Sequence, residues 1–184
     1  MINLAAQLIA KKDPASLAEA ERLLVTATRT GRYPRAHGVN LGLLAKSQGR
    51  FADALAAIDA VLELTPDDTT TLADRGYVLW RLGRLPEALA VLDEVIALDD
   101  EIAPAWLNRG RLHAEMGQPA AAIADFTAAL AADPTFRDAH YNRAVLLIRA
   151  GRPAEARADI EAFVRLGGQP PASVLALVGL VQKP

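Results

Sequence analysis

The sequence repeats with a period of 34 residues along most of its length, and no other feature constrains the fold as strongly. Three series of small residues keep this spacing without slippage. The members are Gly42, Gly76, Gly110 and Ala144; Gly49, Gly83, Gly117 and Gly151; and Ala54, Ala88, Ala122 and Ala156, with Ala20 extending the last series backwards. Because three independent series share one period, the chain is predicted to be a stack of similar small units.

Each unit is predicted to contain two helices joined by a tight turn. Hydrophobic residues make up 52% of the chain and aromatic residues only 5%, and the dominance of Ala and Leu favours closely packed helices over sheets. The first small residue lets a neighbouring helix approach closely, and the second Gly suits a left-handed turn backbone. Pro86, Pro119 and Pro153 fall in the first turn of the second helix, where a missing N–H costs little. In the first unit, Ser16–Glu19 has the form of a capping box.

The period and the motif are similar to those of the tetratricopeptide repeat (TPR), a helix–turn–helix unit. The best copy places the Trp, Gly, Ala, Phe and Pro of the motif at Trp106, Gly110, Ala122, Phe126 and Pro134. The resemblance covers residues 1–170 as five units, at 1–34, 35–68, 69–102, 103–136 and 137–170, followed by a C-terminal capping helix at 171–184. It implies an all-α fold, a right-handed superhelical α-solenoid.

The resemblance also implies that the first helices line a concave groove, where family members hold a peptide or an extended partner segment. Asn40, Asp74, Asn108 and Asn142 share one position in four successive units and form a ladder along these helices. A side-chain amide both donates and accepts, so the ladder can grip a peptide backbone, unless it only caps or hydrates the helix surface. The predicted peptide-binding residues are Asn40, Leu43, Asp74, Tyr77, Trp80, Arg81, Asn108, Arg111, Tyr141, Asn142, Val145 and Arg149.

Charge is distributed unevenly between the two helices of the units. The leading fourteen residues of each unit hold eleven basic and four acidic residues in total, whereas the next eighteen hold eight basic and fifteen acidic residues. This pattern predicts a basic inner side and an acidic outer side. A partner segment that carries acidic residues beside its apolar ones is therefore expected, with charge contributing mainly to the association rate and the register. The alternative is that several of these Arg residues pack between helices, which would reduce the asymmetry.

Composition argues against catalysis, metal binding and nucleic-acid binding. The chain has no Cys and a net charge of −2, so neither a thiolate site nor a positive field for nucleic acid is expected. His37, His113 and His140 lack the i, i+4 spacing of a helical metal pair. The chain is therefore predicted to be noncatalytic and without a cofactor. Its apolar runs are shorter than the ~20 residues of a membrane span, so membrane insertion is not expected and a cytoplasmic location is the default expectation.

The C-terminal segment is unusually apolar for a capping helix. Such a helix should be apolar on one face, since its other face meets water. Six apolar residues here cover more than one face, which predicts either self-association, packing on the last unit, or insertion into a groove. The predicted self-association residues are Val174, Leu175, Leu177, Val178, Leu180 and Val181.

Three functional hypotheses follow. The leading one is a noncatalytic interaction scaffold or adaptor that binds an extended, partly acidic peptide in the groove. The second is a structural scaffold that forms homo-oligomers through its terminal helices. The third is a targeting or regulatory module of a separate enzyme, such as a glycosyltransferase.

Overall fold

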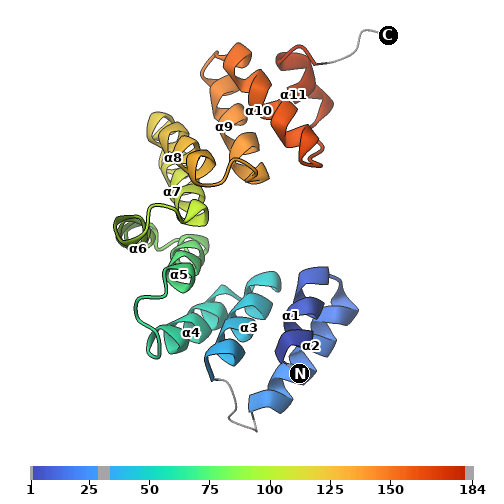
Figure 1. Ribbon diagram of the computed structural model, residues 1–184, viewed down its shortest axis with the longest axis vertical. Coiled ribbons are helices and arrows are strands. Elements are labelled where there is room, and N and C mark those ends of the chain that lie inside the picture. Colours follow the sequence, from blue (N-terminus) through green and yellow to red (C-terminus); the bar gives the residue numbers. More distant parts are fainter. Residues whose placement is uncertain (1, 29–33, 181–184) are drawn as a thin grey trace. The chain divides into compact units, whose positions relative to one another are not determined.

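The computed structural model describes residues 2–28 and 34–180, and within them it contains helices and turns but no strand (Figure 1). Five helix pairs are followed by one short helix, and each predicted repeat contains one pair, with α3 beginning one residue early. The helices are α1 Ile2–Lys11, α2 Pro14–Thr28, α3 Pro34–Ser47, α4 Phe51–Leu62, α5 Thr69–Arg81, α6 Leu85–Leu98, α7 Ala103–Glu115, α8 Pro119–Ala132, α9 Arg137–Arg149, α10 Pro153–Arg165 and α11 Ala172–Leu177.

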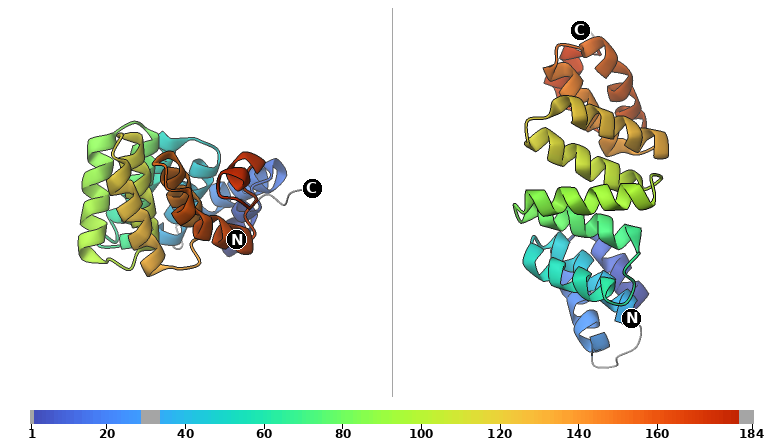
Figure 2. Two further views of the ribbon diagram at one scale, coloured as in Figure 1. Left: turned by 90° about the horizontal axis from the view of Figure 1, so that it is seen from above. Right: turned by 90° about the vertical axis from the view of Figure 1, so that its left-hand side faces the viewer.

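The chain divides into two compact bodies, residues 1–91 and residues 92–184. Hydrophobic clusters join α1 and α2 to α3, and α3 and α4 to α5, in the N-terminal body, and α7 and α8 to α9, and α9 and α10 to the segment around Val178, in the C-terminal body. The N-terminal body has clusters of Ala5, Ile9, Ala20, Leu24 and Leu44 and of Ala45, Ala54, Ile58 and Val78. The C-terminal body has clusters that include Leu107, Ala122, Phe126 and Ala139, and Ala144, Leu147, Ala156, Ile160 and Val178. Figure 2 shows from two further directions how α9 and α10 lie against each other in the second of these bodies.

Gly42, Gly110 and Ala144 of the first series lie where the two helices of their pair meet, as expected. A Cβ atom added to Gly110 would lie 2.6 Å from Cε1 of Phe126, which is 1% exposed. Only a glycine therefore allows α7 to approach α8 while this ring stays in place. At Gly42 the nearest atom to an added Cβ is Cγ1 of Ile58, at 3.4 Å, so the same approach in α3 and α4 is less tight.

The glycines of the second series end the first helices in a left-handed conformation. Their φ angles are 72° at Gly49, 75° at Gly83, 74° at Gly117 and 73° at Gly151. The amide after each glycine closes the turn; that of Arg152, for example, donates to the carbonyl of Leu147 at 2.8 Å. This is the backbone pattern of a Schellman cap, which gives otherwise unpaired helix carbonyls a partner.

Replacing Gly151 by Ala is expected to lower the free energy of unfolding by about 1 kcal/mol, because an L-residue is strained at this φ. Nothing lies within 4 Å of the added Cβ, so the effect should come from the backbone alone. Urea denaturation followed by circular dichroism measures it. Gly151→Asn, which tolerates the left-handed region better, is the matched variant and should lose less. Equal losses for the two variants would contradict this explanation.

The start of α2 differs from the capping box predicted at Ser16–Glu19. Ser16 lies inside the helix, and its backbone amide donates to Oδ1 of Asp13 at 2.9 Å. Asp13 precedes Pro14, the first helical residue, so the cap comes three residues earlier than predicted. Proline at the first helical position has no N–H to satisfy, which makes this start favourable.

The C-terminal helix is much shorter than the predicted 171–184. α11 ends at Leu177, because Gly179 adopts φ 71° and the amide of Leu180 donates to the carbonyl of Leu175 at 2.8 Å. Four of the predicted self-association residues pack on the core of α9 and α10: Val174, Leu175, Val178 and Leu180. Leu177 is 58% exposed, and Val181 lies outside the described residues. Most of the described apolar surface of this segment is thus directed at its own last repeat.

Candidate functional site

The predicted ladder of polar residues is confined to the first helices but is only partly accessible. Asn40 is 5% exposed and Asn108 is 8% exposed. Asp74 forms an ion pair with Lys46 of the preceding first helix, in the N-terminal body. In Asn142, the side-chain nitrogen is buried and has no hydrogen-bond partner. A buried unsatisfied donor costs about 1–3 kcal/mol, which a suitably placed acceptor would offset.

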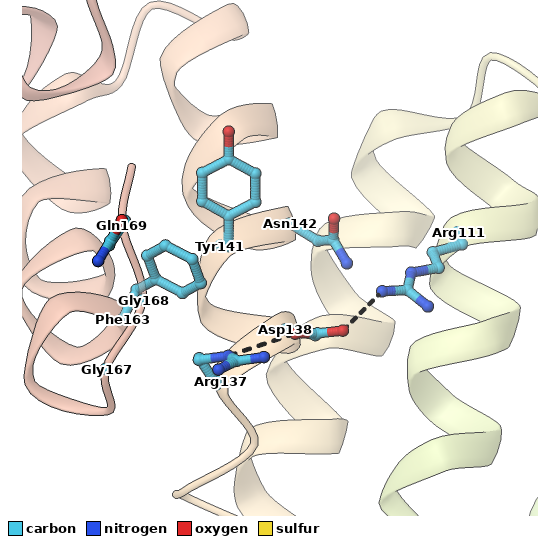
Figure 3. Close-up of a pocket in the computed structure, with 9 residues that line it drawn as sticks. All are labelled: Arg111, Arg137, Asp138, Tyr141, Asn142, Phe163, Gly167, Gly168 and Gln169. Carbon is cyan, nitrogen blue, oxygen red and sulfur yellow. Dashed lines mark hydrogen bonds and ion pairs between the residues drawn. The ribbon is translucent and has the colours of Figure 1, made fainter. Parts of the chain in front are cut away.

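A pocket of about 440 Å³ lies beside Asn142 in the C-terminal body (Figure 3). Its walls come from α7, α9, α10 and the segment 167–169 that follows α10. It collects three of the predicted peptide-binding residues, namely Arg111, Tyr141 and Asn142. The remaining lining residues are Arg137, Asp138, Phe163, Gly167, Gly168 and Gln169. A site built from two successive first helices is what the predicted groove requires in this body.

The charged groups of this pocket form a short chain with Asp138 at its centre. Arg111 donates from Nη2 to Oδ2 of Asp138 at 3.2 Å, and Nε of Arg137 lies 3.7 Å from Oδ1 of the same carboxylate. Figure 3 shows the carboxylate of Asp138 between the two guanidinium groups. Two cations therefore share one anion, and the pocket has an excess of hydrogen-bond donors.

A second pocket, of about 350 Å³, lies beside Asn40 in the N-terminal body. Residues from α1, α3 and the start of α5 line it, including Arg35, Asp68 and Thr71. Arg35 and Asp68 form an ion pair across it. Burial alone would raise the pKa of Asp68, but hydrogen bonds from Arg35 and Thr71 outweigh it and hold this pKa below its usual range. Asp68 is thus ionised, and it also caps α5 by accepting from the amide of Thr71.

Three of the predicted peptide-binding residues, Tyr77, Trp80 and Arg81, form a packed cluster in the N-terminal body. Tyr77 makes edge contacts with Trp80, at a centroid separation of 5.7 Å, and with Phe51, at 6.3 Å. The guanidinium of Arg81 lies 4.3 Å from the centroid of Phe51 and donates to the hydroxyl of Tyr77 at 2.8 Å. These side chains hold one another by edge and cation–π contacts. Arg81 is therefore engaged within the chain.

The other predicted peptide-binding residues lie outside the two pockets. Leu43 packs against the core cluster of α1 to α3. Val145 is half-buried and Arg149 is exposed near the end of α9. Neither Asn108 nor these residues line the pockets beside Asn40 and Asn142.

The Arg residue that follows the ladder position turns away from it. Arg109 donates to both oxygens of Asp125 in α8, at 2.7 to 3.3 Å, and to Asp93 in α6 at 2.7 Å, while its guanidinium lies 4.7 Å from the centroid of Trp106. Burial alone would lower the pKa of Arg109, but hydrogen bonds to the two carboxylates raise it. Nδ1 of His113 lies 2.8 Å from Asp125.

The next repeat shows the same arrangement. Arg143 donates to both oxygens of Asp159 at 2.7 Å, and Nδ1 of His140 lies 2.8 Å from the same carboxylate. Asp125 and Asp159 are each 3% exposed. These arginines tie first helices to second helices, so they are not free to meet a ligand.

The basic inner side predicted from the charge counts is consequently weaker than expected. Seven of its eleven basic residues have an acidic partner within ion-pair distance: Arg35, Lys46, Arg75, Arg109, Arg111, Arg137 and Arg143. The counts overestimate the asymmetry, because three of these side chains cross to acids on second helices. A local excess of positive charge remains where Arg111 and Arg137 share Asp138.

Two of the three histidines, His113 and His140, contact a buried carboxylate. Across residues 2–28 and 34–180, no three His, Cys, Asp or Glu side chains are placed to hold a metal ion. His113 and His140 each face the buried Asp of their own repeat instead of each other.

The predicted peptide-binding set leaves out the arginine at the first position of two repeats, Arg35 and Arg137, although both line a pocket and were counted on the basic inner side. The signal was available, because these two residues occupy the same repeat position. The set also leaves out Phe163 and the segment 167–169, for which the periodic pattern offers no signal, because they belong to the end of the array.

The helix pairs, with a small residue at each tight crossing and a left-handed Gly in the turn, define a helical-repeat protein. A tetratricopeptide repeat model matches residues 39–102 and 107–171, so the chain belongs to the TPR family. The family and the all-α fold predicted from the sequence are confirmed. TPR arrays are in general noncatalytic modules for protein–protein interaction.

Solved structures share this fold. A thermophilic TPR protein of Thermus thermophilus is 24% identical, with 95% of this chain and 97% of that chain covered and a TM-score of 0.75. PilF of Pseudomonas aeruginosa is 21% identical over 96% of this chain and 78% of that chain, with a TM-score of 0.79. PilW, a widely conserved type IV pilus biogenesis factor, is 21% identical over 97% and 86%, with a TM-score of 0.77. No curated protein sequence matches the chain.

Among the described residues, no helix combines the length of a membrane span with sufficient apolar character.

Proposed function

We propose that this protein is a noncatalytic scaffold that binds an extended, partly acidic peptide segment of a partner protein beside Asn40 and Asn142. The observation that carries the proposal is that each body has a pocket at the same repeat positions. Both are lined by a ladder asparagine and by the arginine that begins the repeat, Arg35 or Arg137.

The buried nitrogen of Asn142 supports a role in holding a backbone. It has no hydrogen-bond partner among the described residues, and a peptide carbonyl is an acceptor that would satisfy it after a small turn of the side chain. Specific side chains of the peptide would then be selected by the residues around the amide. Peptide recognition of this kind needs no chemical step, which fits a scaffold.

Self-association through the C-terminal segment has less support. Four of its apolar residues pack on the last repeat, and Leu177 is the one described member of the predicted set that is largely exposed. One exposed leucine supplies a small contact compared with the roughly 800 Å² per partner of a stable interface. Groove binding is therefore the proposal that the described contacts favour.

The test uses purified protein and a display library of random extended peptides, from which a consensus peptide is synthesised. Asn142→Ala is expected to weaken its binding roughly three- to tenfold, as loss of one neutral hydrogen bond implies. Isothermal titration calorimetry gives the dissociation constants. Gln118→Ala is the matched control, because it removes an exposed amide outside both pockets.

Because Asn142→Ala removes an unsatisfied donor, it should leave the helix content and the thermal midpoint close to those of the parent protein. Unchanged affinity in both Asn142→Ala and Asn40→Ala would show that the ladder is structural. Failure of every library peptide to bind would refute the proposal itself.

A further inference from the structure

We infer that the pocket beside Asn142 is a subsite for one acidic side chain, Asp or Glu, that is followed or preceded by an aromatic or large apolar residue. This inference rests on the proposed peptide-binding function and names the chemistry of one part of it. It concerns the C-terminal body alone.

The preference for an acidic side chain follows from the charges that line the pocket. Arg111 and Arg137 share the single carboxylate of Asp138, and the contact of Arg137 with it is the longer one, at 3.7 Å. A guanidinium has five N–H donors in a planar fork that fits a carboxylate. The Arg137 side chain is 52% exposed, so most of its donors remain available. A carboxylate of the ligand would give Arg137 an anionic partner in addition to Asp138, which it shares with Arg111.

A cationic ligand is the alternative, and the same geometry disfavours it. Among the described residues that line the pocket, Asp138 alone is acidic, and it already accepts from Arg111. A lysine or arginine on the ligand would compete with two fixed arginines for one carboxylate. It would also meet like charge from both of them.

The preference for a neighbouring aromatic or apolar residue follows from the two rings that form one wall of the pocket. The rings of Tyr141 and Phe163 lie 4.8 Å apart between centroids, at an angle of 33°. Gly168 is packed onto Phe163, because an added Cβ would lie 2.5 Å from the ring. This close contact keeps the segment 167–169 against the wall (Figure 3). The apolar wall therefore lies in the same pocket as the arginines, and two adjacent residues of an extended peptide can meet both.

The probe is the dipeptide Phe-Glu, acetylated and amidated so that its only charge is the side-chain carboxylate. Its uncharged match is Phe-Gln with the same blocking groups. Titration into the ¹⁵N-labelled full chain is followed by NMR, including the Arg Nε–H and Asn side-chain signals. Phe-Glu is expected to shift signals of Arg137, Arg111 and Gly168. Phe-Gln should bind about tenfold more weakly, since a charge-assisted contact is lost.

Two variants locate the effect. Arg137→Met keeps most of the aliphatic stem and should remove the preference for Phe-Glu over Phe-Gln. Arg152→Met is the control, because Arg152 is similarly exposed, at 48%, and is paired with Glu155 outside the pocket. The preference should persist in this control.

Equal binding of the two dipeptides overturns the inference, as does an absence of binding or a set of shifts outside the pocket. Persistence of the preference in Arg137→Met also overturns it. Binding of the consensus peptide shows whether the acidic subsite alone fails or the proposed peptide-binding function fails as well. If it is weakened by Asn142→Ala but tolerates Gln in place of each Asp or Glu, the peptide-binding proposal stands and the acidic subsite does not.

Discussion

Replacing Asp125 by Ala is expected to lower the free energy of unfolding by about 3–5 kcal/mol, because it removes one partner of a buried ion pair. The Asp125 side chain is 5% exposed and is held by Arg109 and His113, whose side chains are 18% and 16% exposed. Removing the carboxylate leaves a mostly enclosed guanidinium with only Asp93 as an anionic partner. An enclosed cation that loses its partner is far more costly than an exposed one.

Urea denaturation followed by circular dichroism measures this loss, and hydrogen exchange shows where it acts. Faster exchange should be concentrated in α7 and α8, because interactions in a repeat array are mainly between neighbours. Asp125→Asn retains an acceptor for one donor and should lose less than Asp125→Ala. Glu155→Ala is the control, since it breaks an exposed pair with Arg152 and should produce no measurable change. A loss for Asp125→Ala no greater than that of this control would refute the argument.

The repeat period predicts the helix pairs well, because each helix depends on local signals. The glycines at the ends of first helices, the prolines at the start of second helices and the apolar spacing all act within one unit. The direction of Arg109 is not predictable in the same way. Whether a long side chain reaches a ligand or crosses to α8 depends on Asp125, which is distant in sequence and sits in an otherwise apolar stretch of α8.

Two of the errors of sequence reasoning arise because residues are counted without regard to what they contact. The charge counts treat every ionisable side chain as free, and the apolar count at the C-terminus treats the segment as one continuous helix. Gly179 is a helix-ending signal that the apolar run conceals. Once α11 ends at Leu177, the next residues fold back onto α9 and α10, and the predicted second apolar face is largely covered.

Phe126→Ala is expected to cost about 3–5 kcal/mol of unfolding free energy, because this ring is the largest of the fully buried side chains and its loss leaves a cavity. Gly110→Ala should also be destabilising, by about 1–3 kcal/mol, since the new Cβ would lie 2.6 Å from the ring. The two effects should not add. In the Phe126→Ala background the clash with the ring is absent, and the nearest remaining atom to the added Cβ is Cβ of Asp125, at 3.1 Å. Gly110→Ala should therefore cost much less in that background, where the better helix propensity of Ala offsets part of the cost.

Gly42→Ala is the matched control, because Gly42 has the same repeat position but a different neighbour. The nearest atom to its added Cβ is Cγ1 of Ile58, 3.4 Å away, which is close to an ordinary van der Waals contact. Substitution there should therefore be tolerated, and helix propensity favours Ala over Gly by about 1 kcal/mol. If Gly42→Ala stabilises the protein and Gly110→Ala destabilises it, the two positions of the repeat have different packing requirements. If both substitutions destabilise it equally, the need for glycine comes from the backbone and not from the neighbouring side chain. If the effects of Gly110→Ala and Phe126→Ala add, the Phe126 ring is not the reason that position 110 requires glycine.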